Sequence, residues 1–400
     1  MTGLLFYSGS IGLGHVTRDV AIADEVRRLR PDMEIDWLAA PPASDYLRER
    51  GEHLHPEAAR LGAGTASAER LAKPNSLNIT LWALSARKEW GRDAALVQAL
   101  LDSGRYSAAI GDESYDLAIS LIARPERPGC PCFILYDFLG LDRMTMDPLE
   151  WVAIYLFNRM WSKDPSGHYH PIFLGELEDL PMRRFGMWGP PRRAWAERHA
   201  SVVGSALQFD PSAYVDRPAL KTRLGYGEEP LVVVSAGGTS VGADLLRLCM
   251  DAFPHARRVI PDLRMVMVAG PRLSPAARDL PEGVESRGFV PRLHEHFAAC
   301  DLAIVQGGGT STIELTALRR PFLFFPLEGH CEQQKFVVPR QRRLQAGVLL
   351  RVDGTSPQEL AVQIVANIGR GVEYLRPDTG GAEALARIVC EAAGERAQSG

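Results

Sequence analysis

The chain has 400 residues, of which 46% are hydrophobic and 24% are charged, and these proportions exclude a disordered or fibrous protein. Its formal net charge of −4 shows no global basic bias, so charge alone indicates neither a nucleic-acid partner nor an anionic membrane. A chain of this length is too long for a single hydrophobic core, which favours two α/β domains of roughly 180–200 residues each.

The N-terminal residues predict a strand at positions 4–8, a glycine-rich turn, and a helix over 17–30. They lack a basic segment and run straight into glycines, so they do not resemble a signal peptide. Further strands are predicted at 34–39, 108–110 and 133–136, separated by helical patterns that favour a parallel sheet with helices on both faces. The six cysteines include no Cys-x-x-Cys pair, so reduced thiols in a cytoplasmic protein are expected.

The apolar stretch 151–161 is interrupted by Asn158 and Arg159 and is too short to span a membrane. It can line a pocket for an apolar acceptor or form a buried amphipathic helix. Residues 181–193 are rich in Pro, Gly, Arg and Trp, which indicates the approach to an interdomain linker that crosses at 202–204. Trp188 lies among four arginines that can mark a peripheral membrane contact or only a solvated linker, namely Arg183, Arg184, Arg192 and Arg193.

A second α/β series begins with the β-branched run at 231–235 and continues with strands at 265–269, 302–305 and 321–325. We therefore expect an N-terminal domain of residues 1–203 and a C-terminal domain of residues 204–385. The final helix and tail, 386–400, can pack back on the N-terminal domain. Two doubly wound domains of this kind bind ligands in a cleft at the C-terminal edges of their strands.

Glycine-rich loops follow three predicted strands, at 9–15, 237–240 and 306–312. Glycine lets backbone N–H groups approach a phosphate, and the next helix presents its positive N-terminal end. One such loop is often only a tight connection, whereas two in one domain favour a phosphate site. Glu314, one turn into the helix after the third loop, can accept hydrogen bonds from a ribose diol or can only stabilise the helix dipole. Gln333 and Gln334 suit sugar hydroxyls, or they merely cover a helix face.

Residues 307–326 (GGGTSTIELTALRRPFLFFP), followed by Glu332, Gln333 and Gln334, resemble the donor-binding signature of inverting GT-B glycosyltransferases. The pattern is similar to that of the bacterial N-acetylglucosaminyltransferase that makes lipid II and, more loosely, to antibiotic and plant glycosyltransferases. Residues 9–15 are similar to the GGxGGH loop of that family, with bulkier Ile11 and Leu13. The resemblance implies two Rossmann-like domains facing across a cleft, a UDP- or dTDP-sugar donor, a hydroxyl-bearing acceptor, and no metal or other cofactor.

By position, the resemblance implies that Glu314 binds the ribose, and that Glu332, Gln333 and Gln334 belong to the site of the donor sugar. The main chain of Phe289 and Val290 would contact the base. The diphosphate would lie against residues of two glycine loops, namely Gly237, Gly238, Thr239, Gly308, Gly309, Thr310 and Ser311. His330 and Cys331 stand where lipid II-type enzymes carry Lys and Asp, which leaves the acceptor and the sugar open.

Inverting transfer needs a base for the acceptor hydroxyl. His15 follows the first glycine turn, and its ordinary pKa near 6.5 suits a base, although it can equally bond the loop or touch phosphate. Asp112 and Glu113 end a predicted strand, so one of them can be the base, orient His15, or only cap the next helix. The residues expected on the acceptor or phosphate side are Gly12, Gly14, Arg18 and Arg272.

Other protein classes stay open. A nucleotide-sugar epimerase of GT-B fold would share the donor site without an acceptor, and a non-catalytic partner subunit would share it without chemistry. A dinucleotide-dependent oxidoreductase is disfavoured, because the glycines at 9–14 are spaced G-x-x-G-x-G and Asp36 lies inside a strand.

Overall fold

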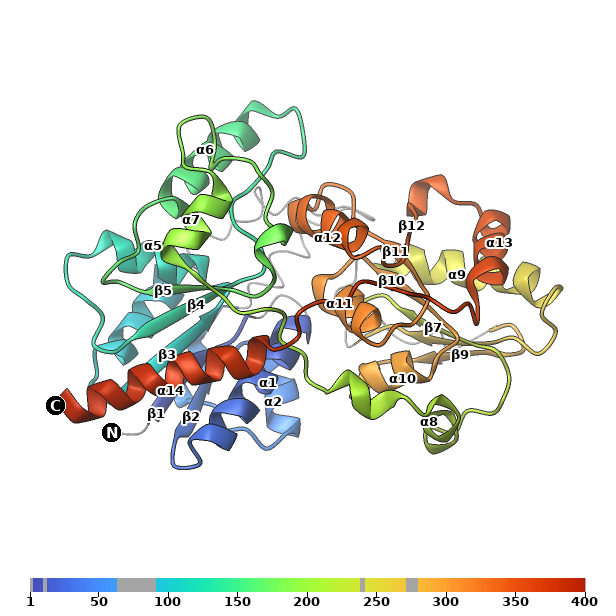
Figure 1. The fold of residues 1–400 in the computed structure, drawn as a ribbon, viewed down its shortest axis with the longest axis horizontal. Helices are drawn as coiled ribbons and strands as arrows, with labels where there is room; N and C mark the ends of the chain where they lie inside the picture. The colour runs from blue at the N-terminus through green and yellow to red at the C-terminus, as the bar shows by residue number, and fades with distance from the viewer. Residues whose placement is uncertain (1–2, 10–12, 63–90, 238–241, 271–279, 400) are drawn as a thin grey trace. The chain divides into compact units, whose positions relative to one another are not determined.

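A computed structural model describes residues 3–9, 13–62, 91–237, 242–270 and 280–399 of the chain. Contacts divide the chain into two compact units (Figure 1). Unit 1 reaches Gln208 and resumes at Asp378, whereas unit 2 comprises Phe209–Pro377.

Unit 1 is built on a six-stranded parallel sheet in the order β2-β1-β3-β4-β5-β6. The strands are β1 (Gly3–Tyr7), β2 (Glu34–Leu38), β3 (Tyr106–Asp112), β4 (Cys132–Tyr136), β5 (His170–Phe173) and β6 (Ser201–Val202). The helices are α1 (Leu13–Leu29), α2 (Ala43–Glu49), α5 (Tyr115–Ala123), α6 (Pro148–Trp161), α7 (Arg192–His199) and α14 (Gly381–Ser399).

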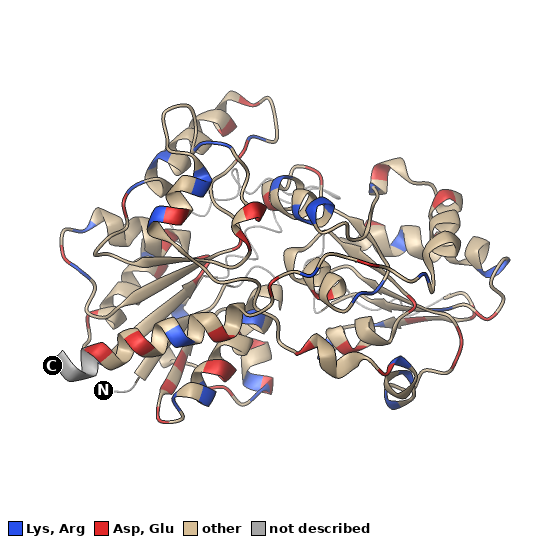
Figure 2. Cartoon of the chain, viewed as in Figure 1, with Lys and Arg blue, Asp and Glu red and all other residues tan. Residues whose placement is uncertain are grey.

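Unit 2 has a second six-stranded parallel sheet, in the order β12-β11-β10-β7-β8-β9. The strands are β7 (Leu231–Ser235), β8 (Arg264–Val268), β9 (Val284–Arg287), β10 (Leu302–Gln306), β11 (Phe322–Phe325) and β12 (Val348–Leu349). The helices are α8 (Arg217–Arg223), α9 (Ala243–Arg257), α10 (Leu293–Ala299), α11 (Gly309–Ala317), α12 (Val338–Arg343) and α13 (Pro357–Asn367). Strands β1, β4, β7, β10 and β11 contain no charged residue, as their burial between helix layers requires (Figure 2).

Each sheet has a point at which the chain reverses its direction across the sheet. In unit 1 the chain passes from β1 to β2 and then returns to β3 on the other side of β1. In unit 2 it passes from β7 to β8 and β9 and returns to β10 on the other side of β7. Ligands of doubly wound sheets bind outside the carboxyl ends of the strands at such a switch point. The predicted pair of Rossmann-like domains is therefore confirmed, and its topology directs attention to the loops after β1, β3, β7 and β10.

The first crossing between the units comes later in the chain than the predicted boundary at 203, and the return comes earlier than the predicted boundary at 385. Val202 lies in β6, and the Val203 N–H donates to the Phe173 carbonyl at 3.1 Å, so these residues complete the sheet of unit 1. The chain enters unit 2 after Gln208 and leaves it after Pro377. These boundaries put the whole of α14 in unit 1, where it packs on α1 and β3.

Helix α6 extends the predicted apolar stretch by three residues at its start and is capped by Asp147, whose carboxylate accepts the Leu149 N–H at 2.8 Å. Its outer face is exposed, so it is not a buried core helix: Val152 is 58% exposed and Leu156 is 50% exposed. Within the described ranges, none of the helices combines the length and the apolar character that a membrane span requires.

Candidate functional site

At the switch point of unit 1, a histidine and an aspartate from separate elements are hydrogen-bonded. His15 lies in the first turn of α1, and its Nδ1 is 2.7 Å from Oδ2 of Asp112, the last residue of β3. The carboxylate holds one nitrogen of the ring and so orients Nε2, as a proton-transferring imidazole requires. Glu113 lies on that other side, with its Oε2 3.8 Å from Nε2.

The position of the His15–Asp112 pair leaves no room for a side chain at residue 9, which is a glycine. A Cβ at Gly9 would lie 3.0 Å from Asp112 Oδ2 and 3.3 Å from the His15 ring, so a side chain here would displace the two groups. Gly14 lies inside α1, whereas Gly12 falls outside the described residues. The N-terminal glycine loop thus accommodates the histidine–aspartate pair, a role that phosphate binding does not require.

Burial and the neighbouring carboxylate shift the pKa of His15 in opposite directions. Burial is the largest single effect and disfavours the imidazolium, but the charge and the hydrogen bond of Asp112, together with the charge of Glu113, outweigh it, and the pKa of His15 is raised to about 10. The sequence prediction of a base relied on the ordinary value near 6.5. A ring that is protonated at neutral pH must lose its proton before it can accept another, so base activity from His15 has to increase toward alkaline pH.

Arg18 has a structural position in the same network. Only 6% of its side chain is exposed, and its guanidinium contacts Asp112 and Asp137, the residue that follows β4. Its Nη2 also lies 2.9 Å from His15 Nδ1, so Arg18 can hold both members of the pair in position. The predicted place of Arg18 on the acceptor or phosphate side stays a prediction. Asp137 was missed from the sequence, although it follows an apolar strand just as Glu113 does.

A further buried acid, Asp19, was also missed. It lies in α1, where it accepts a hydrogen bond from Ser8 Oγ at 2.5 Å, and burial raises its pKa well above the usual range. Its place one turn beyond His15 on a helix that covers the sheet is the signal that could have found it. Asp36, the acid considered for a dinucleotide, accepts a hydrogen bond from Tyr106 Oη at 2.7 Å inside the sheet and holds that strand in place.

In unit 2 the loop between β10 and α11 combines a tight glycine with an open one. A Cβ at Gly307 would lie 2.6 Å from the Cα of Pro326, whereas a Cβ at Gly308 would meet no atom of the described residues within 4 Å. Gly308 caps α11 without a side-chain hydrogen bond, so the first N–H groups of the helix, on Gly309, Thr310 and Ser311, face this opening. A helix N-terminus with room before it is an anion-binding arrangement.

Glu314 lies one turn into α11 and is 9% exposed. Its carboxylate makes no hydrogen bond or ion pair with any other described residue, and burial raises its pKa to about 8. A buried carboxylate without partners is costly unless a ligand supplies the missing hydrogen bonds. The position therefore suits a ligand that carries hydroxyl donors.

Other predicted donor residues lie along the same edge of the sheet. Gly237 follows β7, the neighbour of β10, with a φ of 77° that favours glycine. Phe289 and Val290 follow β9, two strands farther along, and both are partly exposed. The predicted residues Gly238, Thr239 and Arg272 lie outside the described part of the chain.

The side chains of the two glutamines after β11 form hydrogen bonds within the protein. Gln333 Oε1 accepts the Leu327 N–H at 2.7 Å, and Gln334 Nε2 donates to the Leu327 carbonyl at 3.0 Å. They therefore cover and fix the loop, which leaves the Gln333 amide N–H groups and Gln334 Oε1 for a ligand. Glu332 is partly exposed beside them. A π-helix, Gln333–Val337, begins here, a rare geometry that is frequent at functional sites and that the sequence did not reveal.

His330 completes this loop. Its Nδ1 accepts the Gln333 N–H at 3.4 Å, and burial lowers the pKa of His330 to about 4. The ring is therefore neutral at physiological pH. The lysine expected at this position in lipid II-type enzymes would place a positive charge in the loop, whereas neutral His330 places none.

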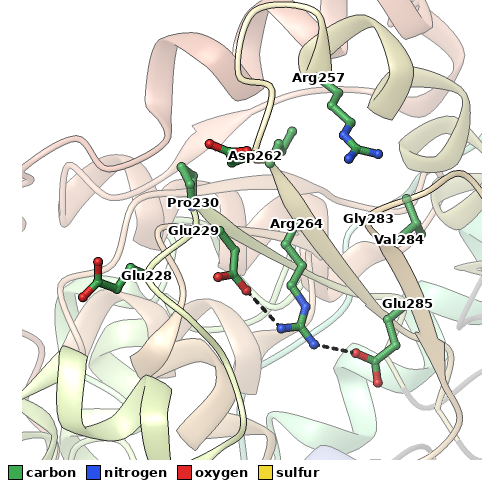
Figure 3. Close-up of a pocket in the computed structure, with 10 residues that line it drawn as sticks. Glu228, Glu229, Pro230, Arg257, Asp262, Arg264, Gly283, Val284 and Glu285 are labelled. Carbon is green, nitrogen blue, oxygen red and sulfur yellow. Dashed lines mark hydrogen bonds and ion pairs between the residues drawn. The ribbon is translucent and has the colours of Figure 1, made fainter.

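A separate pocket lies at the opposite edge of the sheet in unit 2, where β7, β8 and β9 begin (Figure 3). Its volume is ≈ 730 Å³. Arg264 bridges Glu229 at 3.0 Å and Glu285 at 3.1 Å across it, and Glu285 also pairs with Arg287 at 2.6 Å, so both carboxylates are engaged in ion pairs. Because doubly wound sheets bind ligands at the carboxyl edge, we place the candidate site there and not in this pocket.

Known proteins of similar sequence are glycosyltransferases. No family model matches the chain. An uncharacterized glycosyltransferase of Methanosarcina acetivorans is 28% identical over 342 residues, which cover 83% of this chain and 79% of that protein. Another, of Methanopyrus kandleri, is 30% identical over 191 residues, which cover 47% of this chain and 53% of that protein.

The UDP-N-acetylglucosamine--N-acetylmuramyl-(pentapeptide) pyrophosphoryl-undecaprenol N-acetylglucosamine transferase of Carboxydothermus hydrogenoformans is 28% identical over 193 residues. These cover 42% of this chain and 51% of that protein. The chain thus spans about half the length of two of these three relatives.

Solved structures agree in fold. Arabidopsis thaliana UGT89C1, complexed with UDP, has a TM-score of 0.61 at 14% identity, and the match covers 98% of this chain and 100% of that one. The glycotransferase of kitacinnamycin has a TM-score of 0.56 at 15% identity, with 98% and 95% covered. The fold is therefore GT-B, and the resemblance to GT-B glycosyltransferases drawn from the sequence is confirmed.

Proposed function

The chain has the GT-B fold and is related to glycosyltransferases, and from this premise we propose that it transfers a sugar from a UDP- or dTDP-sugar to a hydroxyl-bearing acceptor. We further propose that transfer inverts the anomeric configuration and needs no metal. The observation that carries the proposal is the carboxylate of Glu314, one turn behind the open N-terminus of α11, which is buried with no partner among the residues that the structure describes.

The donor half of the proposal uses unit 2. The ribose diol of the nucleotide donates two hydrogen bonds to Glu314, and the diphosphate takes the N–H groups of Gly309, Thr310 and Ser311. As the bond between the sugar and the diphosphate breaks, the leaving group gains negative charge. The helix dipole and these N–H groups stabilise that charge, which is the electrostatic part of catalysis.

The acceptor half uses unit 1. Asp112 orients His15, and Nε2 of His15 takes the proton of the acceptor hydroxyl as that oxygen attacks the anomeric carbon. Asp112 stabilises the imidazolium that forms, while Arg18 holds Asp112 in place. Glu113, 3.8 Å from Nε2, also favours the protonated ring, so His15 has to lose its proton to solvent before each cycle.

The first test is nucleotide binding by the whole chain, measured as a shift in melting temperature with UDP, dTDP, GDP, ADP and NAD. A ligand that binds only the folded state raises the melting temperature. We expect a shift with UDP or dTDP and none with NAD. A shift with NAD alone, or with none of the five, would contradict the donor site.

The second test separates transfer from the alternatives that share the donor site. The nucleotide sugar is incubated with candidate acceptors, and both nucleoside diphosphate and sugar products are analysed. Release of UDP or dTDP that depends on the acceptor supports a transferase. An epimeric nucleotide sugar without release would indicate an epimerase, and binding without turnover would indicate a non-catalytic subunit. Activity that is lost with EDTA and restored by Mn²⁺ or Mg²⁺ would contradict the metal-free mechanism.

A further inference from the structure

The outer face of α6 is apolar although it is exposed to solvent. Its residues are 42–69% exposed, namely Leu149, Trp151, Val152, Tyr155 and Leu156. The buried face carries Ala153, Ile154 and Trp161 together with two polar groups. Glu150 accepts the N–H groups of Met144 and Thr145, and Asn158 exchanges two hydrogen bonds with Leu141. An ordinary surface helix has a polar outer face, so the apolar outer face of α6 suits contact with something apolar.

A second exposed apolar segment is fixed beside the first. Met182 is 78% exposed, Met187 76% and Trp188 80%. Arg192, at the end of the second segment, donates to the Leu141 carbonyl at 3.0 Å, and Leu141 is hydrogen-bonded to Asn158 of α6. Phe185, buried within that segment, also packs against Trp161 at the end of α6, with ring centroids 6.4 Å apart. Figure 1 shows α6, α7 and the connecting loop together in unit 1.

Within these two segments the exposed charges are of one sign, whereas the exposed acids Asp164 and Glu178 lie just outside them. The exposed charged residues of 141–160 and 181–193 are four arginines, Arg143, Arg159, Arg183 and Arg184. The acids in the same ranges are engaged locally: Asp142 pairs with Arg192, Asp147 caps α6, and Glu150 is fully buried. Arg143 lies over the Trp151 ring at 4.4 Å, so an arginine and an indole stand together on this surface.

We propose that the α6 face, defined as Leu149, Trp151, Val152, Tyr155 and Leu156 together with Met182, Met187 and Trp188, docks on a lipid bilayer that contains anionic headgroups. Exposed Leu, Val and Met enter the boundary of the acyl chains, and the Trp and Tyr side chains occupy the interface. Each arginine near an anionic leaflet contributes about 1 kcal/mol of attraction. The inference does not depend on the proposed transferase reaction, because docking needs neither donor nor acceptor.

The test is co-sedimentation of the full chain with vesicles of phosphatidylcholine alone and of phosphatidylcholine mixed with phosphatidylglycerol. We expect binding to the anionic vesicles that weakens with salt. An apolar double variant, Leu156→Ser with Trp188→Ser, and a charge variant, Arg183→Glu with Arg184→Glu, should each bind about tenfold more weakly or worse. All four side chains are exposed, so the substitutions leave the core intact.

Matched controls come from exposed residues of unit 2. Val259→Ser with Val362→Ser controls for loss of exposed apolar area, since these residues are 63% and 64% exposed. Arg258→Glu with Arg370→Glu controls for net charge. Both controls should bind vesicles like the wild type, and all variants should keep the melting-temperature shift with nucleotide, which separates this result from a failure of the proposed function.

Three outcomes of the vesicle experiment would contradict docking of the α6 face on lipid. A wild-type chain that stays in the supernatant with anionic vesicles overturns the proposal. If that chain also self-associates in sedimentation velocity and the apolar variant does not, the α6 face contacts a second copy of the chain. Binding that both test variants retain, or that the controls lose equally, places the lipid contact elsewhere and overturns the assignment of this face.

Discussion

Glu314 is the residue whose replacement separates binding from folding most cleanly. Its carboxylate is buried without a partner among the described residues, so the isosteric change Glu314→Gln removes no contact that the folded chain uses. We expect the affinity for UDP or dTDP to fall at least tenfold, about 1.4 kcal/mol, by calorimetry. Glu373→Gln, at an exposed position of the same unit, is the control and should bind like the wild type.

The raised pKa of Glu314 adds a dependence on pH. Ribose hydroxyls donate to the ionised carboxylate, so binding lowers the pKa of Glu314 and releases a proton. With a pKa of about 8 in the unliganded chain, affinity should rise as the pH increases from 6 to 8 and then level off. The slope should be flatter in the Glu314→Gln variant. An unchanged slope would show that another group titrates.

His15 predicts a pH dependence of turnover. The pKa of about 10 keeps the ring protonated at neutral pH, so kcat should rise with pH toward that value if the neutral ring is the base. Asp112→Asn removes the carboxylate that raises the pKa, and should shift the rise toward neutral pH while lowering its plateau. His15→Gln should lower kcat far more than donor affinity. Wild-type turnover in that variant would exclude His15 as the base.

Single residues were predictable where a loop joins a strand and a helix. His15, Asp112, Gly308 and Glu314 lie at switch points that the alternation of strands and glycines implies. The sequence offered Asp112 as one of the residues that could orient His15. Other partners were not predictable, because side-chain contacts between separate elements depend on packing. The ion pair of Arg18 with Asp137 is one example. The shifted pKa of His15 is a consequence of the same packing.

At the scale of elements, alanine substitutions at the neighbouring residues Gly307 and Gly308 should have opposite effects on stability and on nucleotide affinity. Gly307→Ala puts a methyl group 2.6 Å from Pro326, so it should lower the melting temperature. Gly308→Ala adds a methyl group where no atom of the described part of the chain lies within 4 Å, and the φ of Gly308, −68°, suits alanine. This variant should keep its stability and lose nucleotide affinity. A Gly308→Ala chain that binds UDP or dTDP normally would move the phosphate away from α11.

The elements that carry β-branched or aromatic runs were predicted from the sequence, and the short ones were not. β7 (LVVVS) is buried along its whole length, and a strand buried on both faces needs a continuous apolar run, so its composition predicts a strand. β9 (VESR) lies at the sheet edge with every residue only half-buried, and β6 and β12 have two residues each. Pairing with an existing sheet, rather than local composition, creates such strands.

At the scale of the whole molecule, α14 ties the end of the chain to unit 1. Leu385 and Val389 are fully buried where α14 packs on α1 and β3. Leu385→Ala should destabilise unit 1 by about 2–5 kcal/mol. In calorimetry, the transition that nucleotide stabilises should stay in place while the other moves down. If both transitions shift equally, the units unfold as one, and Leu360→Ala, buried in unit 2, should then give the same pattern.

The return of the chain to unit 1 also has a consequence for biosynthesis. Residues 209–377 leave the ribosome as a continuous stretch, so unit 2 can fold as soon as they are free. The strands of unit 1 emerge first, but the helix that covers α1 and β3 is translated only after unit 2 is complete. Part of the first sheet therefore waits with apolar surface uncovered throughout the synthesis of unit 2, and this nascent chain is the state in which chaperones would be needed most.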